Sequence, residues 1–401
     1  MPDTSPQVSY DEATKQLDPP LAIIDLAAFD DNAADLVRRA QGRPIRVASK
    51  SVRCRYLLDR VLAMPGYAGL LCYSLREAMW LCAKGTSDDL VVAYPTVDRA
   101  ALRDLAADPV ARRTITIMVD SIEHLDFVDA TLGAGHPDLR IALELDASWR
   151  PLAHLSTVHI GSRRSPVHTV AQAQAFTKAA LRRPGFNLVG IMSYEGQIAG
   201  LGDLPPGRPV RGALVRFIQR HSGSELVGRR AAAVAAVRAL TPLEFVNGGG
   251  TGSIEVTRGD SSVTEIAAGS GLIGPTLFDA YSRFRPRPAA LFALSVVRRP
   301  SPNTATLFAG GYVASGPGTP DRLPSPYLPA GLSLLGTEGA GEVQTPVTGK
   351  AARTLRLGDR VWLRHAKAGE LAERFVEYHV IEGDRVSATV PTFRGEGVNF
   401  G

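Results

Sequence analysis

Short apolar runs recur along the first two-thirds of the chain, and polar or helix-like segments separate them. Each run is almost continuously apolar, which is typical of strands that are buried on both faces of a parallel sheet. The pattern predicts strands at Ile45–Ser49, Ala68–Tyr73, Leu90–Tyr94, Thr114–Val119, Arg140–Leu145, Asn187–Ser193, Leu243–Val246 and Val263–Ala267.

The segments between these runs carry apolar residues three and four positions apart, which indicates helices with one buried face. Ser74 is followed three residues later by Glu77, a capping-box pattern that predicts a helix over Leu75–Lys84, and Gly85 follows that helix. An Ala-rich stretch predicts a long helix over Ser224–Leu240. Strands that alternate with helices in this number predict an α/β fold with a TIM (β/α)8 barrel, and a doubly wound sheet is the alternative.

The pattern changes after the Arg-Pro-Arg-Pro segment at 285–288, where Gly and Pro separate runs of alternating apolar residues. These runs predict a C-terminal β-rich domain with strands that include Leu291–Val297, Thr304–Phe308, Arg360–Leu363 and Phe375–Ile381. The Gly/Pro-rich stretch Gly316–Pro326 is predicted to be a loop. We expect residues 22–287 to form the barrel, and residues 1–21 and 288–401 to form the β-rich domain.

Lys50 ends the first apolar strand, which is an unusual place for an ammonium group because its burial is costly. The C-terminal ends of barrel strands form the active site of this fold. A partly desolvated lysine there has a lowered pKa and can attack a carbonyl carbon. The alternative is a lysine that extends from the strand end into water.

Two glycine-containing segments follow the seventh and eighth strands, where this fold usually binds phosphate. The first runs from Asn247 to Ser253, with Gly249, Gly250 and Thr251 at its centre, and the second contains Gly269 and Ser270. Glycines let backbone N–H groups approach an anion, and hydroxyl groups add donors. Tight turns are the alternative explanation for each segment. Neither segment matches the dinucleotide fingerprint or a Walker motif.

The fifth and sixth strands also end in polar residues. Glu144 and Asp146 close the fifth, and two arginines, Arg163 and Arg164, follow at the end of a loop. These charges could pair at the rim of the core or face water. The sixth strand ends in Ser-Tyr-Glu-Gly, and its tyrosine, Tyr194, could pack at the rim or lie over a flat ligand.

One late segment of the β-rich domain clusters His365, Lys367 and Glu370 just after a strand. His365 could act as a general base or as a metal ligand. A structural histidine beside a solvated charged face is the alternative.

Composition narrows the class of protein. Apolar residues make up 45% of the 401 residues and charged residues 21%, enough for a sizeable core in a soluble protein. The net charge of +5 is scattered among acids, which favours a solvated surface over nucleic-acid binding. The three cysteines form no C-x-x-C pair and are expected to be thiols. Because neither a signal peptide nor a membrane-spanning run is visible, we expect a cytoplasmic protein without membrane contact.

Taken together, these segments resemble the fold-type III pyridoxal-phosphate enzymes, and more narrowly the D-threonine aldolase and D-serine dehydratase group. That group begins with an alanine racemase-like barrel. The similarity runs from about Pro20 to the C-terminus and is greatest to a bacterial subgroup usually labelled amino acid deaminase/aldolase. The order and spacing of the motifs carry the resemblance.

The resemblance implies a cofactor, pyridoxal 5′-phosphate, and roles for individual residues. Lys50 matches the lysine that holds the cofactor as a Schiff base. Arg164, in Arg-Ser-Pro-Val, matches the arginine of an Arg-Cys-Gly-Val motif, and Tyr194 matches the tyrosine of a Tyr-His-Gly motif. The family's Gly-Gly-Gly-Thr-Gly phosphate loop corresponds to 248–252, and a second phosphate segment corresponds to Gly269 and Ser270.

The chain departs from the family at its metal site. The resemblance implies a divalent metal on a His-x-Asp or His-x-Cys pair, but here the pair is His365 and Lys367. A protonated lysine is a poor ligand, so a divalent metal is in question. We hypothesise that the Lys367 ammonium supplies the positive charge near the substrate hydroxyl.

The resemblance implies a homodimeric lyase acting on a small β-hydroxy amino acid, with D-configuration favoured. Proton removal from the β-hydroxyl would give glycine and an aldehyde, and loss of that hydroxyl would give ammonia and a keto acid. Lys50 would take the Cα proton, and His365 would act on the hydroxyl. The alternatives are an amino-acid racemase with Tyr312 or Tyr378 as a second base, a cofactor-carrying regulatory protein, and a phosphate-sugar barrel enzyme without cofactor.

Overall fold

The computed structural model describes residues 6–151 and 158–401, and these form two compact units. One unit contains a closed barrel and spans residues 36–49, 58–269 and 400–401. The other spans residues 1–35, 50–57 and 270–399, of which residues 1–5 lie outside the described part. This second unit includes the N-terminal strand and the short segment around Lys50.

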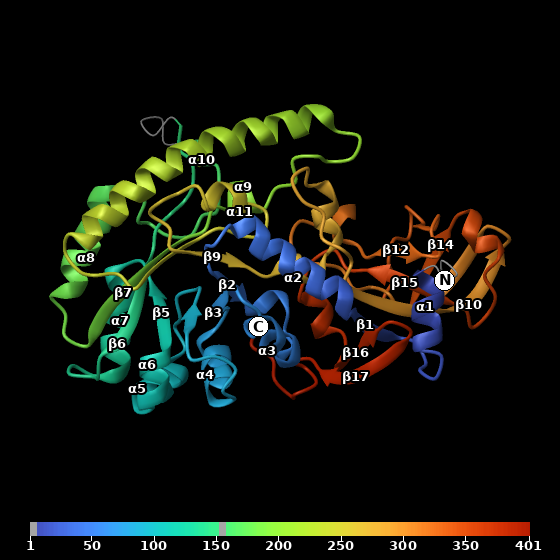
Figure 1. Ribbon diagram of the computed structural model, residues 1–401, viewed down its shortest axis with the longest axis horizontal. Helices are drawn as coiled ribbons and strands as arrows, with labels where there is room; N and C mark the ends of the chain where they lie inside the picture. Colours follow the sequence, from blue (N-terminus) through green and yellow to red (C-terminus); the bar gives the residue numbers. More distant parts are fainter. Residues whose placement is uncertain (1–5, 152–157) are drawn as a thin grey trace. The chain divides into compact units, whose positions relative to one another are not determined.

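Eight parallel strands close the barrel in the order in which they occur along the chain. Several of them are labelled in Figure 1. The predicted TIM barrel is therefore confirmed, and the open, doubly wound alternative is excluded. The strands are β2 (Ile45–Ala48), β3 (Tyr67–Cys72), β4 (Leu90–Val92), β5 (Ile115–Val119), β6 (Leu139–Glu144), β7 (Phe186–Ser193), β8 (Phe245–Gly248) and β9 (Glu265–Ala268).

Helices connect the barrel strands and cover their outer side. The main ones are α4 (Leu75–Ala83), α5 (Arg99–Ala107), α6 (Pro109–Thr114), α7 (Ile122–Leu132), α8 (Val170–Leu181) and α10 (Pro209–Arg238). Two others, α2 (Leu26–Ala40) and α3 (Arg55–Leu62), have residues in both units, and α9 (Gly196–Ala199) and α11 (Ile254–Thr257) are single turns. None of the described helices is long and apolar enough to cross a membrane.

The longest helix, α10, begins well before the predicted Ser224. Its first residue is Pro209, whose fixed φ and missing N–H suit the first helical position. The prediction failed because the polar, Gly- and Ser-containing stretch at 220–224 is typical of a helix end. Gly223 and Leu226 are instead buried on the side of the helix that packs inward.

Apolar side chains fill the barrel interior, including Val91, Met118, Ala142 and Phe245. Gly190 makes room for Phe245, because a Cβ at this glycine would overlap the aromatic ring. A charged group lies in the same interior: Arg46 is 2% exposed, and its Nε donates to Glu265 at 2.6 Å. The barrel is therefore a packed core, and its chemistry is confined to its ends.

The second unit is built on a nine-stranded, mostly antiparallel sheet. Its main path runs β13-β14-β11-β10-β1-β16-β17, and β15 pairs with both β10 and β12. The bounds are β1 (Leu21–Asp25), β10 (Ala290–Ser301), β11 (Thr304–Phe308), β12 (Ser325–Leu328), β13 (Ser333–Leu334), β14 (Gln344–Thr348), β15 (Arg360–Arg364), β16 (Glu377–Glu382) and β17 (Arg385–Pro391). The predicted C-terminal β-rich domain is confirmed.

The core of this sheet unit includes residues from both ends of the chain. Trp362 is fully buried, and its indole N–H donates to Asp11 Oδ1 at 2.8 Å. Asp11 lies on α1 (Pro6–Ala13), and Tyr10 of the same helix packs in the core with Leu291. One turn of helix, α12 (Ser270–Ile273), and several 3-10 turns complete the unit, among them η1 (Ser49–Ser51), η3 (Thr276–Ala280), η4 (Pro320–Arg322), η5 (Lys350–Arg353) and η6 (Glu370–Glu373).

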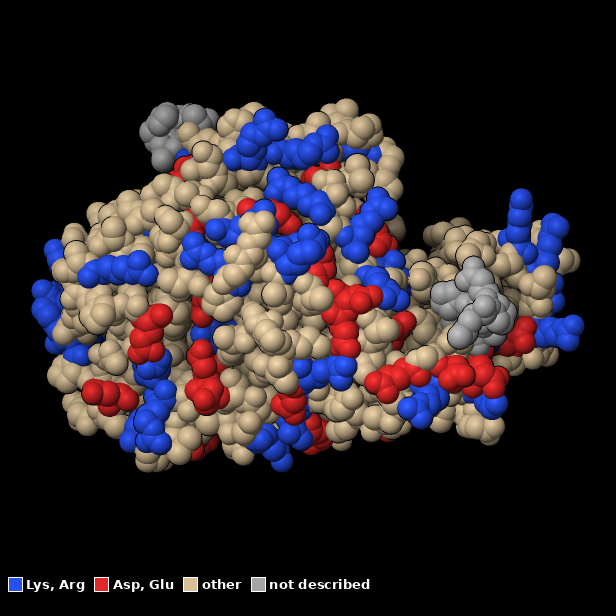
Figure 2. Space-filling model, in the orientation of Figure 1, with Lys and Arg blue, Asp and Glu red and all other residues tan. Residues whose placement is uncertain are grey.

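Two expectations about side chains agree with the structure. Cys54, Cys72 and Cys82 are free thiols. Lys and Arg side chains alternate with Asp and Glu over most of the face drawn in Figure 2, with a basic group along α10. Charge of both signs is interspersed, as expected for a solvated surface.

Candidate active site

At the carboxyl ends of the barrel strands, the structure brings Arg164 and Tyr194 together. The Arg164 guanidinium carbon lies 4.9 Å from the ring centre of Tyr194, which directly follows β7. The same carbon lies 5.3 Å from the ring of Tyr94, two residues beyond β4. Both distances suit cation–π contacts. Sequence reasoning did not single out Tyr94, although its place just after a strand could have suggested it.

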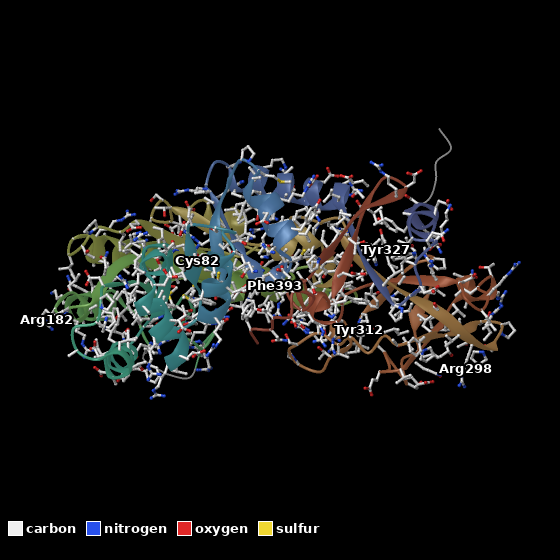
Figure 3. All side chains as sticks on the ribbon, turned by 90° about the horizontal axis from the view of Figure 1, so that it is seen from below. Cys82, Arg182, Arg298, Tyr312, Tyr327 and Phe393 are labelled. Carbon is white, nitrogen blue, oxygen red and sulfur yellow. The ribbon has the colours of Figure 1, made fainter. Side chains whose placement is uncertain are left out.

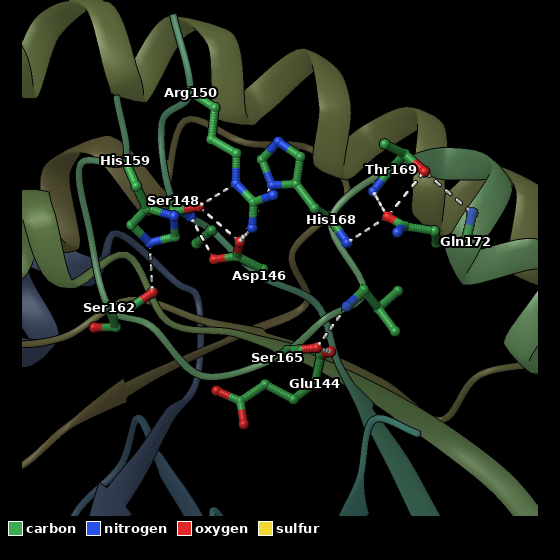
Figure 4. A network of polar contacts seen from close by, with 12 residues as sticks. Glu144, Asp146, Ser148, Arg150, His159, Ser162, Ser165, His168, Thr169 and Gln172 are labelled. Atoms are coloured by element: carbon green, nitrogen blue, oxygen red, sulfur yellow. Dashed lines mark hydrogen bonds and ion pairs between the residues drawn. The ribbon is translucent and has the colours of Figure 1, made fainter. Parts of the chain in front are cut away.

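Glu144 is the last residue of β6 and is 4% exposed. Burial raises the pKa of its carboxyl group from 4.5 to about 7; Arg164 partly opposes this shift, and the carboxylates of Asp120 and Asp146 add to it. Figure 4 draws Glu144 with its carboxyl group outside the marked polar network. A carboxyl group that titrates near neutral pH can both give and take a proton.

Asp146 belongs to a polar network in the same region (Figure 4). Burial raises the pKa of its carboxyl group, but contacts from His168, Ser148 and Arg150 outweigh this effect and hold the pKa below its usual range. The Ser148 N–H and hydroxyl donate to Asp146 at 2.8 and 2.6 Å. Asp146 is therefore an ionised anchor for the loop after β6, which includes residues 152–157 outside the described part.

The loop after β8 is held by contacts inside the barrel unit. The N–H of Gly249 donates to Glu195 Oε2 at 2.8 Å, and the N–H of Gly250 donates to Ser253 Oγ at 3.1 Å. Gly249 has a φ of +90°, a left-handed conformation that favours glycine. A Cβ at Gly250 would lie 3.3 Å from Tyr194 Cε2, so the loop packs directly against that ring.

The other residues expected at the phosphate end have different surroundings. The Asn247 amide donates to Glu265 Oε1 at 2.8 Å in the barrel interior. The Thr251 carbonyl accepts from Arg39 Nη2 at 2.7 Å. Gly269 is the first residue after β9, and the hydroxyl oxygen of the next residue, Ser270, lies 3.3 Å from that of Ser51.

Lys50 lies in η1, directly after barrel strand β2, but it belongs to the compact unit that contains the sheet. Gly369 lies against it, because a Cβ at this glycine would overlap the Lys50 carbonyl oxygen. Gly369 also has a φ of +80°. The backbone of Lys50 therefore packs on the segment that carries His365, Lys367 and Glu370.

The cluster is held by short polar contacts. The Lys367 ammonium donates to Ser315 Oγ at 2.7 Å and lies 3.6 Å from Glu370 Oε1. Glu370 accepts from the Ser315 N–H at 2.8 Å and from its hydroxyl at 2.6 Å. The His365 Nδ1 lies 2.7 Å from the Lys367 carbonyl oxygen, so the backbone fixes the imidazole ring.

His365 is 4% exposed, and burial lowers the pKa of its imidazole group. A neutral imidazole can accept a proton. Within residues 6–151 and 158–401, no three His, Cys, Asp or Glu side chains gather so as to hold a metal ion. The position two residues after His365 carries an ammonium group paired with a carboxylate, and this donor set does not fit a divalent cation.

The two tyrosines considered as a second base lie in the unit that contains the sheet. Tyr378, on β16, is 1% exposed, and burial raises the pKa of its hydroxyl group. Tyr312 (labelled in Figure 3) packs between Phe292 and Phe375, with ring centres 5.2 and 5.6 Å away. Burial also raises the pKa of its hydroxyl. Such hydroxyls are poor bases near neutral pH, which weakens the racemase alternative.

A closed barrel with a lysine at the end of its first strand, an arginine between aromatic rings and an antiparallel sheet unit defines the alanine racemase-like class of folds. The model of the alanine racemase N-terminal domain family matches residues 24–275, and the chain belongs to this family.

Two individual relatives and one crystal structure show which enzymes the chain is similar to. The chain is 28% identical over 260 residues to 3-hydroxy-D-aspartate aldolase of Paracoccus denitrificans, covering 64% of this chain and 60% of that protein. It is 26% identical over 304 residues to D-threonine aldolase of an Arthrobacter species, covering 74% and 72%. The crystal structure of D-threonine aldolase from Filomicrobium marinum superposes with a TM-score of 0.76 over 94% of this chain and 96% of that one, at 21% identity.

Proposed function

We propose that the protein is a lyase that uses pyridoxal 5′-phosphate to cleave or dehydrate a β-hydroxy amino acid of D-configuration. The family membership and the activities of two relatives, both aldolases of D-amino acids, support this proposal. The observation that carries it is the position of Lys50, an amine directly after the first barrel strand whose backbone packs on the segment of His365 and Lys367. We further propose the expected domain boundaries and a homodimer, both on the resemblance.

The described residues fit a flat, anionic cofactor. Gly249 and Gly250 let the loop backbone pack closely beside the Tyr194 ring, because a Cβ at Gly250 would lie 3.3 Å from Tyr194 Cε2, and Arg164 lies over the face of that ring. These groups suit an aromatic ring and a phosphate group. Bound pyridoxal phosphate supplies an electron sink that weakens the bonds to the substrate's α-carbon.

Three residues of the chain, Lys50, His365 and Lys367, have separate roles in the proposed reaction. The Lys50 amine would hold the cofactor through its aldehyde carbon and, as a free amine, would take or return a proton at Cα. The neutral His365 imidazole would take the proton of the β-hydroxyl in Cα–Cβ cleavage; in dehydration, the ring once protonated would give its proton to the departing hydroxyl, so that water leaves. The Lys367 ammonium favours negative charge on that oxygen. No step is assigned to a divalent metal.

Replacing Lys50 by Ala tests the proposal. The wild-type protein with added pyridoxal phosphate should absorb visible light, and borohydride should fix the cofactor on the peptide that contains Lys50. Lys50→Ala should lose both signals and all turnover, because it removes the amine that the proposal places on the cofactor. Lys178→Ala, which removes an exposed lysine on α8, is the matched control and should keep them.

Product analysis identifies the reaction. Incubation with D-threonine or 3-hydroxy-D-aspartate should release glycine and an aldehyde, or ammonia and a keto acid. Appearance of the L-enantiomer alone would replace the lyase by a racemase. A Lys50→Ala protein with wild-type turnover would contradict the cofactor-based function altogether.

A further inference from the structure

Three charged side chains lie completely buried beneath the loop after β8. Glu195 follows Tyr194 at the end of β7, Arg230 lies on α10, and Asp260 lies just after α11, each with a side-chain exposure of 0%. Burying charged groups is costly unless they are paired and hydrogen-bonded. A buried charge cluster contributes little net stability by itself, so its contacts indicate a further role.

Arg230 is held mainly by Asp260. Its Nε donates to Asp260 Oδ2 at 2.7 Å, and the other carboxylate oxygen, Oδ1, accepts from the N–H and hydroxyl of Ser262 at 2.8 and 2.6 Å. The contact from Arg230 Nη1 to Glu195 Oε2 is longer, at 3.4 Å. Arg230 therefore compensates the charge of Glu195 while leaving that carboxylate able to accept stronger hydrogen bonds.

Both carboxylate oxygens of Glu195 accept hydrogen bonds from the loop and from α11. Its Oε2 accepts the N–H of Gly249 at 2.8 Å, and its Oε1 accepts the hydroxyl of Thr257. Gly249 begins the loop and Thr257 ends α11, which follows it. A single carboxylate thus binds the first residue of the loop, Gly249, and the last residue of α11, Thr257, through charge-assisted hydrogen bonds.

These contacts occupy two backbone N–H groups of the loop that the sequence suggested as donors to an anion. The Gly249 N–H is committed to Glu195 and the Gly250 N–H to Ser253 Oγ, so both hold the loop from within. The glycines also bring the loop close to its neighbours, because a Cβ at Gly250 would lie 2.8 Å from Ala199 Cβ. Glu195 therefore sets the conformation of the loop. Because Glu195 directly follows Tyr194, it also sets where the loop packs against the Tyr194 ring.

We propose that Glu195 is a positioning residue that holds the Gly249–Ser253 loop in the conformation that binds the phosphate group of the cofactor. The inference rests on the proposed function, since it assumes that this loop binds that phosphate. Glu195 acts through the backbone of Gly249 and the hydroxyl of Thr257, and Arg230, itself paired with Asp260, lies 3.4 Å from its buried carboxylate.

The test compares pyridoxal phosphate with pyridoxal, which lacks the phosphate group. Dissociation constants are measured by absorbance titration of the wild-type protein and of Glu195→Gln, Glu195→Ala and Thr257→Val. Loss of a hydrogen bond to a charged group should weaken pyridoxal phosphate binding about ten- to a hundredfold in Glu195→Ala, with smaller losses in the other two. Pyridoxal affinity should change by less than about threefold, within the scatter of a neutral contact.

Controls separate this inference from a general loss of structure and from the proposed function. Glu244→Gln breaks an ion pair with Arg140 at the opposite end of β8 and should leave both affinities unchanged. A wild-type protein that binds no pyridoxal phosphate refutes the proposed function. Wild-type binding with unchanged affinities in Glu195→Gln and Thr257→Val, or with equal losses for both ligands, refutes the positioning role. If Glu195→Ala fails to fold, Thr257→Val alone decides.

Discussion

At the scale of single residues, Glu144 links the structure of the barrel mouth to pH. Its raised pKa means that the folded protein keeps a proton at this carboxyl group between pH 4.5 and about 7, where the unfolded chain has lost it. The corresponding stability is fully present below pH 4.5 and is lost as pH rises through about 7. Burial of a titratable acid at this site therefore lowers the stability of the fold as pH rises through about 7.

Replacing Glu144 by Gln should remove this pH dependence. Relative to the wild type, the variant should gain free energy of unfolding as pH rises from 5 to 8, by on the order of 3 kcal/mol at most. Urea titrations at several pH values measure the difference. Glu338→Gln removes an exposed glutamate and should follow the wild-type curve. Parallel curves for the wild type and Glu144→Gln would show that Glu144 is ionised throughout this range.

At the scale of elements, the first turn of α4 shows how a local sequence signal becomes structure. The hydroxyl of Ser74 accepts the Glu77 N–H at 3.2 Å, as the capping pattern predicts. The Glu77 carboxylate, however, accepts the N–H of Tyr73, one residue before the cap, at 2.7 Å. The side chain of Glu77 is buried, so it joins the end of β3 to the helix that follows.

Ser74→Ala should lower the free energy of unfolding by about 1 kcal/mol, because it leaves one helical N–H without its partner. Ser121 offers a matched comparison, since it precedes α7 without making a side-chain cap hydrogen bond. Ser121→Ala should therefore cost less. Chemical denaturation followed by circular dichroism compares the two variants, and equal losses would show that the Ser74 hydrogen bond contributes nothing measurable.

The elements also show which features the sequence could predict. All eight barrel strands were found because each is a short run of buried apolar residues, and such runs need no knowledge of their partners. The start of α10 was missed because a polar stretch interrupts its helical pattern of apolar residues. Strand β13 was missed because two residues are too few to show the alternation of a strand. The same distinction holds at the site. Lys50 could be found from its own position after a strand, whereas the role of Glu195 depends on Gly249, which lies 54 residues away.

At the scale of the whole molecule, the N-terminal strand connects the two ends of the chain. β1 lies inside the nine-stranded sheet, antiparallel to β10 and parallel to β16, where Ile23 is opposite both Leu291 and His379. The sequence suggested only that the opening residues could join this domain. An apolar run of four residues does not reveal that its neighbours in the sheet come from the last third of the chain.

A chain that starts at residue 26 should therefore lose the order of the sheet while keeping the barrel strands, all of which lie later in the sequence. The loss exposes the edges of β10 and β16 and removes Leu21 and Ile23 from the core. The cysteines report each unit separately. Cys54 is buried near Tyr378 of β16, whereas Cys72 is buried in barrel strand β3.

Thiol labelling followed by mass spectrometry gives the readout for this truncation. In the full chain only the partly exposed Cys82 should react quickly, and in the shortened chain Cys54 should react as well while Cys72 stays protected. Protection of Cys54 in the shortened chain would mean that β16 keeps its place without β1. Rapid labelling of Cys72 would mean that the barrel cannot persist without the sheet, so that the two units fold as one.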